Sequence, residues 1–193
     1  GAFVGDSIRA AGEFETNLNV LQATSGATTE ELERVRQTAI DLGADLTLPA
    51  TSAQDAQLSM LELIKAGFSV DEAMAAAKGS LQLAAAAEVD AATGAEMMAA
   101  AINAFKLEAS DAVHIADIFA NAVNVSAASM TDINQGFQQA GFAFHQAGFG
   151  ADDLATSLAI LTNAGLSGSD AGTALKNAIM RMFNPTEKAK GVM

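Results

Sequence analysis

The sequence predicts an all-α protein, and three observations support this prediction. Half of the 193 residues are hydrophobic, with Ala, Leu, Ile, Met and Val prominent, and only two are Pro. Apolar residues recur every three or four positions through most of the chain, which is the spacing of one helix face. Ser, Thr or Asp precedes many of these runs and Gly follows them, as at helix ends. We therefore expect about nine helices, joined mainly by short links, in a compact bundle.

Signals for five helices occupy the first part of the chain. The first helix is expected over residues 2–22, followed by a polar link at 23–27. Each of the next four begins at a residue that can accept a hydrogen bond from the first turn, with an acidic partner three positions later in most cases. These capping residues are Thr28 with Glu31, Ser52 with Asp55, Ser69 with Glu72, and Asp90. Gly43 and Gly67 are expected to end the second and third helices, and the fifth runs to Phe105.

Two more helices are expected in the middle of the second half. Ser110 precedes the sixth, which should cover residues 111–125. Ser129 with Asp132 forms the next capping box, so the seventh helix begins there. The seventh helix is expected to end at Gly148, because Gly suits the left-handed position after a helix.

Residues 158–185 carry the most closely spaced stop and start signals of the chain. The eighth helix is expected to end at Gly165, for the same reason as the seventh. Ser167 or Ser169 can cap the ninth. Pro185 is expected to stop the ninth helix, because Pro cannot donate the hydrogen bond that would continue it.

Three of these junctions share one pattern, in which Ala-Gly is followed by an apolar residue. They lie at Gly67, Gly148 and Gly165. The first two glycines are 81 residues apart, and each is followed at the same offset by a pair of acidic residues. We interpret residues 29–109 and 110–185 as two pseudo-repeated four-helix units. The alternative is that Ala-Gly helix ends recur by chance in any all-α chain.

The ends of the chain complete this division. Residues 1–28 form an N-terminal helix and link, and residues 186–193 are typical of the start of a following helix. The chain also lacks an initiating Met. We therefore expect it to be a fragment of a longer protein.

Charge and composition exclude several classes of function. The formal net charge is −13, from 10 basic and 23 acidic residues, so the clustered Lys and Arg of a nucleic-acid-binding surface are absent. No Cys is present, which removes disulfides and thiolate metal sites. The most apolar run, residues 73–87, is shorter than the ~20 residues that span a bilayer.

A few residues deserve comparison with known kinds of site. Asp111, His114 and Asp117 could bind a divalent metal from one helix, but a helix start with an acidic residue at the positive end of the dipole is the simpler interpretation. His145 is expected in a core or interface. Residues 168–173 are Gly-rich, but they lack the Lys and the preceding strand of a phosphate loop. We expect no enzyme activity, no metal and no cofactor.

Several segments, taken in chain order, carry a family resemblance. They are Phe14-Glu15 within residues 12–21, Thr29-Glu30-Glu31-Leu32 within 27–42, LELIKAGFSV at 61–70, the Ala-rich stretch 72–87, the Ala-Asp, Ala-Asn and Ser positions of 116–126, and residues 158–185. The last segment contains Ala164-Gly165-Leu166, Ala171-Gly172-Thr173-Ala174-Leu175 and Asn184-Pro185-Thr186. In this order and spacing they resemble the core domain of phage tail tape measure proteins, over nearly the whole chain. The positions that we expect to be structural motif residues of the family are Gly67, Gly148, Gly165, Gly172, Thr173 and Pro185.

The resemblance implies a structural virion protein that acts in tail assembly, tail length determination and genome ejection through the tail tube. It would lie in the tube lumen or at the tail tip, and in the host cytoplasm before assembly. The implied partners are the tail tube, the tail tip or baseplate hub, tail assembly chaperones and a few further copies of the chain. No specific nucleic-acid binding is implied, and membrane contact is expected only during ejection.

Within such a protein, length is attributed to long extended helical segments. A compact acidic unit is therefore expected at an end of the ruler, in contact with the tube, the tip or neighbouring copies. Two alternatives stay open at this point. One is a helical interaction or adaptor module of another cellular system, and the other is a membrane-active helical protein.

Overall fold

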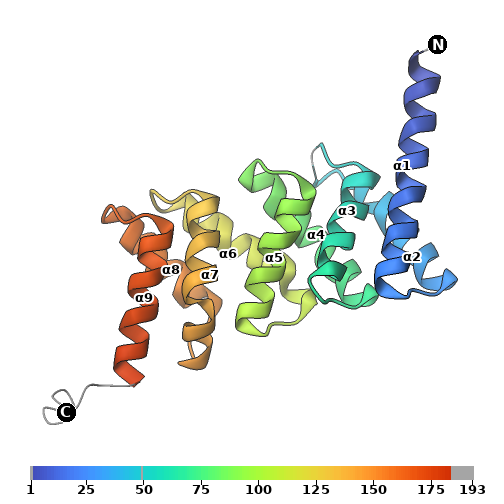
Figure 1. Cartoon of the computed structure of the whole chain (residues 1–193). Coiled ribbons are helices and arrows are strands. Elements are labelled where there is room, and N and C mark those ends of the chain that lie inside the picture. Colours follow the sequence, from blue (N-terminus) through green and yellow to red (C-terminus); the bar gives the residue numbers. More distant parts are fainter. Residues whose placement is uncertain (1, 49, 184–193) are drawn as a thin grey trace, which may run out of the picture. The chain divides into compact units, whose positions relative to one another are not determined.

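The computed structural model of the chain describes the backbone of residues 2–48 and 50–183, and side chains from residue 12 onward. All regular structure in these residues is helical (Figure 1), as the sequence predicts. The helices are α1 (Ala2–Ser25), α2 (Thr29–Gly43), α3 (Ala53–Lys65), α4 (Val70–Ala87), α5 (Ala91–Phe105), α6 (Ala112–Asn124), α7 (Met130–Gln146), α8 (Ala151–Asn163) and α9 (Gly168–Phe183), with a 3₁₀ turn, η1 (Ala109–Asp111), before α6. None of the described helices is both long and apolar enough to cross a membrane.

The capping boxes found in the sequence are confirmed. In each box, the hydroxyl of the capping residue accepts a hydrogen bond from the backbone N–H three residues later. The acidic side chain of that later residue accepts a hydrogen bond from the backbone N–H of the capping residue. These boxes are Thr28 with Glu31, Ser52 with Asp55, Ser69 with Glu72, and Ser129 with Asp132. At α9 the choice between two serines is resolved, because the N–H of Asp170 donates to the Oγ of Ser167.

The start of α6 differs from the prediction. Ser110 was expected to open it, but that residue lies inside η1, and α6 begins at Ala112. The carboxylate of Asp111 accepts a hydrogen bond from the N–H of Glu108, and the N–H of Asp111 donates to the Glu108 carbonyl. This closed turn delays the helix by one residue beyond the predicted start at 111.

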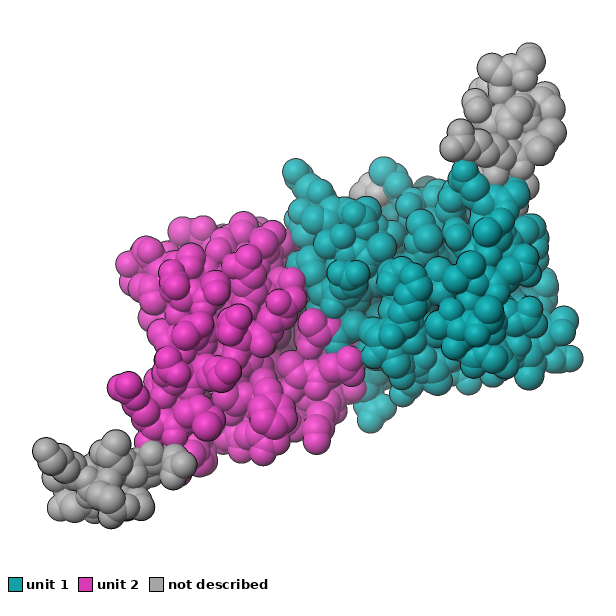
Figure 2. All heavy atoms as spheres, viewed as in Figure 1, with its two compact units in different colours: residues 1–99, 108–116 teal, residues 100–107, 117–193 magenta. Residues whose placement is uncertain are grey.

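The chain divides into two compact units (Figure 2). Unit 1 comprises residues 1–99 and 108–116, and unit 2 comprises residues 100–107 and 117–193. The division therefore falls inside α5 and α6. The predicted repeat of residues 29–109 in 110–185 rests on sequence similarity and stays a prediction. The predicted helix start at 186–193 lies outside the described residues.

Unit 1 packs α1, α2 and α4 around α3. The largest wholly buried side chains include Leu21, Met60, Leu63 and Leu83. Polar contacts also join its helices: the amide of the buried Gln57 donates to the backbone carbonyl of Phe14, 2.9 Å away.

Unit 2 is organised around α7, which packs on both α8 and α9. Phe137 of α7 is 1% exposed. The centroid of its ring lies 4.5 Å from that of the Phe119 ring and 5.6 Å from that of the Phe105 ring. Leu154 and Leu158 of α8, which packs against α7, are also wholly buried. The core of unit 2 thus combines a cluster of Phe rings with aliphatic side chains.

Candidate functional site

The motif glycines predicted from the sequence are helix ends of one geometry. Gly67, Gly148 and Gly165 have φ angles of 100°, 82° and 93°, a region that residues with a Cβ rarely occupy. In each case the N–H of the next residue donates to a carbonyl five residues back, which satisfies a helix end that would otherwise be unpaired. These bonds are Phe68 to Leu63 at 3.2 Å, Phe149 to Phe144 at 3.0 Å, and Leu166 to Leu161 at 3.1 Å.

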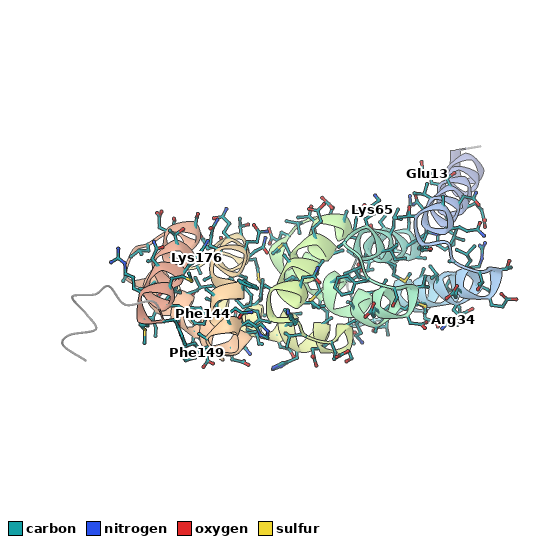
Figure 3. All side chains as sticks on the ribbon, turned by 60° about the horizontal axis from the view of Figure 1, so that its bottom comes forward. Glu13, Arg34, Lys65, Phe144, Phe149 and Lys176 are labelled. Atoms are coloured by element: carbon teal, nitrogen blue, oxygen red, sulfur yellow. The ribbon has the colours of Figure 1, made fainter. Side chains whose placement is uncertain are left out.

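The apolar residue after Gly148 folds back onto its own helix. The ring of Phe149 lies against that of Phe144, with centroids 5.6 Å apart (Figure 3). Because the next helix starts within a few residues, each junction fixes the exit of one helix and the entry of the next. Sequence and local hydrogen bonding are enough to define these junctions.

Two further junctions of the same geometry were missed in the sequence. Glu88 and Lys106 have φ angles of 55° and 52°, although neither is Gly. The N–H of Val89 donates to the Ala84 carbonyl at 3.0 Å, and that of Leu107 to the Ile102 carbonyl at 3.1 Å. The signal available was the apolar residue after each polar one, because it completes the hydrophobic contact of this helix end.

Gly172 lies where α9 crosses α7. A Cβ at this position would lie 2.8 Å from the Cα of Gly136 and 2.9 Å from the Cβ of Gln139, so the two helices approach too closely for a side chain. Thr173, the next residue, is exposed. Gly172, and not Thr173, therefore makes the contact between α7 and α9. The remaining predicted motif residue, Pro185, lies outside the described residues.

Asp132 links the starts of the same two helices. One carboxylate oxygen accepts from the N–H and the hydroxyl of Ser129, at 3.0 and 2.6 Å, and the other accepts from the N–H of Gly168 at 2.9 Å. The hydrogen bonds from Ser129, then that from Gly168, lower the pKa of Asp132 below its usual value. One ionised side chain thus caps α7 and holds the first residue of α9.

The remaining candidate positions are not gathered into a reactive site. Within the described part of the chain, no three His, Cys, Asp or Glu side chains are placed to hold a metal ion, and this includes Asp111, His114 and Asp117. His145 is half-buried, and its ring lies nearly perpendicular to that of Phe105, with the ring centroids 6.4 Å apart. This position agrees with the packing role expected for it.

Unit 2 also carries two open grooves beside α8. One, of about 280 Å³, lies between α6 and α8 and includes Val125 and Ile160, which are 71% and 64% exposed. The other, of about 440 Å³, is lined by the α7 end and by α8 and α9, and includes Phe149 and Met182. Neither groove gathers charged groups of the kind that catalysis uses, so their chemistry is that of apolar contact surfaces.

Comparisons with known proteins agree with the resemblance seen in the sequence. The family model described as phage-related minor tail protein matches residues 36–193. The chain is 40% identical over 185 residues to a tape measure protein of Pneumococcus phage Dp-1, covering 96% of this chain and 16% of that protein. It is 29% identical over 179 residues to a probable tape measure protein of Escherichia phage P2, covering 92% of this chain and 22% of that protein. The chain thus spans only about a sixth to a fifth of these relatives' length. No solved structure matches it significantly.

Proposed function

The chain belongs to the phage-related minor tail protein family, a family of structural tail proteins and not of enzymes, and we propose that it is a folded contact element of a tail tape measure protein. The whole protein would act in tail assembly, tail length determination and genome ejection through the tail tube. Within it, this segment would meet the tail tube, the tail tip or further copies of itself. It would contribute attachment and not length.

One geometric observation carries this proposal: the helices are short, and most are joined by short links. The longest described helix, α1, has 24 residues, and each of the other described α-helices has 13 to 18. Left-handed helix ends and capping boxes join them, so most helices are connected by links of only a few residues. A segment that measured length would instead extend along the tube axis.

The test is an in-frame deletion of these residues in a phage that encodes them, with tail lengths measured by electron microscopy. As a continuous helix, 193 residues would span about 290 Å, so deleting a ruler segment should shorten every tail by up to this amount. For a contact element we expect few complete tails, and those that form should keep the normal length.

The matched control is a deletion of equal size from a long uninterrupted helical stretch of the same gene, which should shorten tails in proportion. Two results would contradict the proposal. One is a proportional shortening after deletion of these residues, and the other is a normal number of normal tails.

A further inference from the structure

The outward face of α9 carries four exposed residues in one stripe. Each residue turns a helix by about 100°, so positions that differ by four, seven and eleven lie close together on one side. Asp170, Ala174, Asn177 and Arg181 have this spacing and fall within an arc of about 60°. All four are exposed, and Gly172, which contacts α7, lies on the opposite side of α9. The stripe is therefore a helix face that α7 and α8 do not cover.

The stripe is complementary to itself when two α9 helices run antiparallel. Its members are separated by four, three and four positions, an order that reads the same in both directions. Reversing a second copy of the helix therefore brings its Arg181 opposite Asp170, and its Asn177 opposite Ala174. Both contacts occur twice in the pair, as at any two-fold interface. One helix face thus contains both halves of an interface.

We propose that this face of α9 binds the same face of a second copy of the chain, with the two helices antiparallel. Two Asp170–Arg181 ion pairs would fix the register at the ends, and the small Ala174 would let the helices approach closely at the centre. A second copy is one of the partners that the proposed function allows, and the inference rests on that function only for the role of the pair in a tail.

Charge favours a second copy at this face and selects the antiparallel direction. The whole chain has a formal net charge of −13, but α9 has two basic residues and one acidic residue, so its own formal charge is +1. Copies that meet along α9 therefore avoid most of the repulsion between acidic surfaces. A parallel pair would place Asp170 beside Asp170 and Arg181 beside Arg181, and such like-charge contacts are unfavourable.

The proposed pair also gives the exposed Thr173 a contact. Thr173 and Met180 border the stripe on the same side, about 60° and 80° around α9 from Asp170. In the antiparallel pair, Met180 of one copy would lie beside Thr173 of the other. Met180 is 54% exposed, and this contact would cover part of its apolar surface. A motif residue that makes no contact between α7 and α9 would thus act between copies.

Sedimentation equilibrium of the 193-residue chain measures the self-association directly. One face of a 16-residue helix is small beside the standard protein–protein interface. We therefore expect weak, reversible dimers that become populated as the concentration approaches about 1 mM.

Two charge reversals test the pairing. Arg181→Asp would place Asp opposite Asp, and Asp170→Arg would place Arg opposite Arg, so each variant should dimerise at least about tenfold more weakly. Mixed in equal amounts, the two variants should pair with each other about as well as the wild type, because every acidic residue again faces a basic one. The matched control is Lys176→Asp, at the residue labelled on α9 in Figure 3. It changes the charge by the same amount as Arg181→Asp, but it lies about 120° around the helix from Asp170 and should leave dimerisation unchanged.

A second measurement does not alter any charge at the ion pairs. The sequence contains no Cys, so a single introduced thiol can form a disulfide only with a second copy. Ala174 lies close to the proposed two-fold axis, which brings the two Cα atoms within the ~7 Å that a disulfide can span. Under mild oxidation, Ala174→Cys should therefore form cross-linked dimers at least about tenfold faster than the control Lys176→Cys, which is also exposed.

Several results would overturn the proposal. One is a wild-type chain that stays monomeric at every concentration, and another is an equal effect of Arg181→Asp and Lys176→Asp. Equal cross-linking rates for the two Cys variants would place the contact elsewhere on the chain. Charge variants that are folded by circular dichroism but do not pair when mixed would exclude the antiparallel register. These measurements use the purified chain, so their failure would leave the deletion test of the proposed function unaffected.

Discussion

Unit 1 and unit 2 are built from helices of similar length but differ in charge and in the contacts that join them. Unit 1 holds 17 of the chain's 23 acidic residues and 5 of its 10 basic residues, so its formal net charge is −12. Unit 2 holds the other 6 acidic and 5 basic residues, so its formal net charge is −1. Unit 1 contains several ion pairs between its own residues, for example Arg34 with Asp71 and Lys78 with Asp45. Phe is distributed the other way: seven of the ten are in unit 2, as are the ring contacts between described Phe residues.

The difference indicates where single substitutions should matter most. The ion pairs of unit 1 are solvent-accessible, and such pairs contribute little each. The ring cluster and the Gly136–Gly172 contact of unit 2 are buried and closely packed, so they have little room to adjust. We therefore expect substitutions at cross-helix contacts to be costly in unit 2 and mild at the charged pairs of unit 1.

The largest effect is expected from Phe137→Ala in unit 2. Removing a buried ring that contacts Phe105 and Phe119 should lower the free energy of unfolding by about 3–5 kcal/mol. Urea unfolding followed by circular dichroism measures this change. Phe142→Ala, on the same helix at 64% exposure, is the control and should cost less than about 1 kcal/mol. Equal costs for the two variants would mean that the ring cluster is not the core of unit 2.

Gly172→Val should have the next largest effect. The new side chain would collide with the backbone at Gly136, and we expect a loss of about 1–3 kcal/mol in the free energy of unfolding. Ala174→Val adds a β-branched residue at an exposed position of the same helix, so it controls for helix propensity and should cost below about 1 kcal/mol. If both variants unfold at the same urea concentration, α7 and α9 do not depend on this close approach.

Asp132→Asn should cost about 1 kcal/mol at neutral pH, which is typical of a weakened helix cap. The effect should depend on pH, because hydrogen bonds lower the folded-state pKa of Asp132. A carboxyl group with a lowered pKa stabilises the fold above its unfolded-state pKa, and that contribution is lost as the pH falls through the folded-state value. The stabilities of variant and wild type should therefore converge in acid. A difference that stays constant down to about pH 2 would show that ionisation is not involved.

The smallest effect is expected from Arg34→Ala in unit 1. Arg34 and Asp71 lie 2.6 Å apart, but their side chains are 52% and 68% exposed, so the pair should contribute below about 1 kcal/mol. A double-mutant cycle with Asp71→Ala measures the coupling free energy. A coupling above about 2 kcal/mol would remove the contrast between the two units.

Much of the helical layout could be predicted because it is encoded locally. The capping boxes at Thr28, Ser52, Ser69 and Ser129 involve residues three positions apart, and the left-handed glycines are identified by residue type. Glu88 and Lys106 were missed because nothing in their own chemistry favours a positive φ.

The long-range parts of the candidate site could not be predicted from the sequence. The motif order marked Gly172 as a family position, but its partner Gly136 lies 36 residues away on another helix. The second role of Asp132, in binding the N–H of Gly168, and the grooves beside α8 likewise depend on how helices pack. Residue spacing within a helix carries no information on such pairings.

We propose that this segment acts in a tail as a folded element and not as an extended ruler. The most direct test is to introduce Phe137→Ala and Phe142→Ala separately into a phage that encodes the chain, and to count complete tails and measure their lengths by electron microscopy. If the fold is what the tail requires, Phe137→Ala should markedly reduce the number of complete tails without changing their length, and Phe142→Ala should leave both unchanged. Equal numbers of normal tails from the two variants, despite the loss of stability from Phe137→Ala, would contradict the claim.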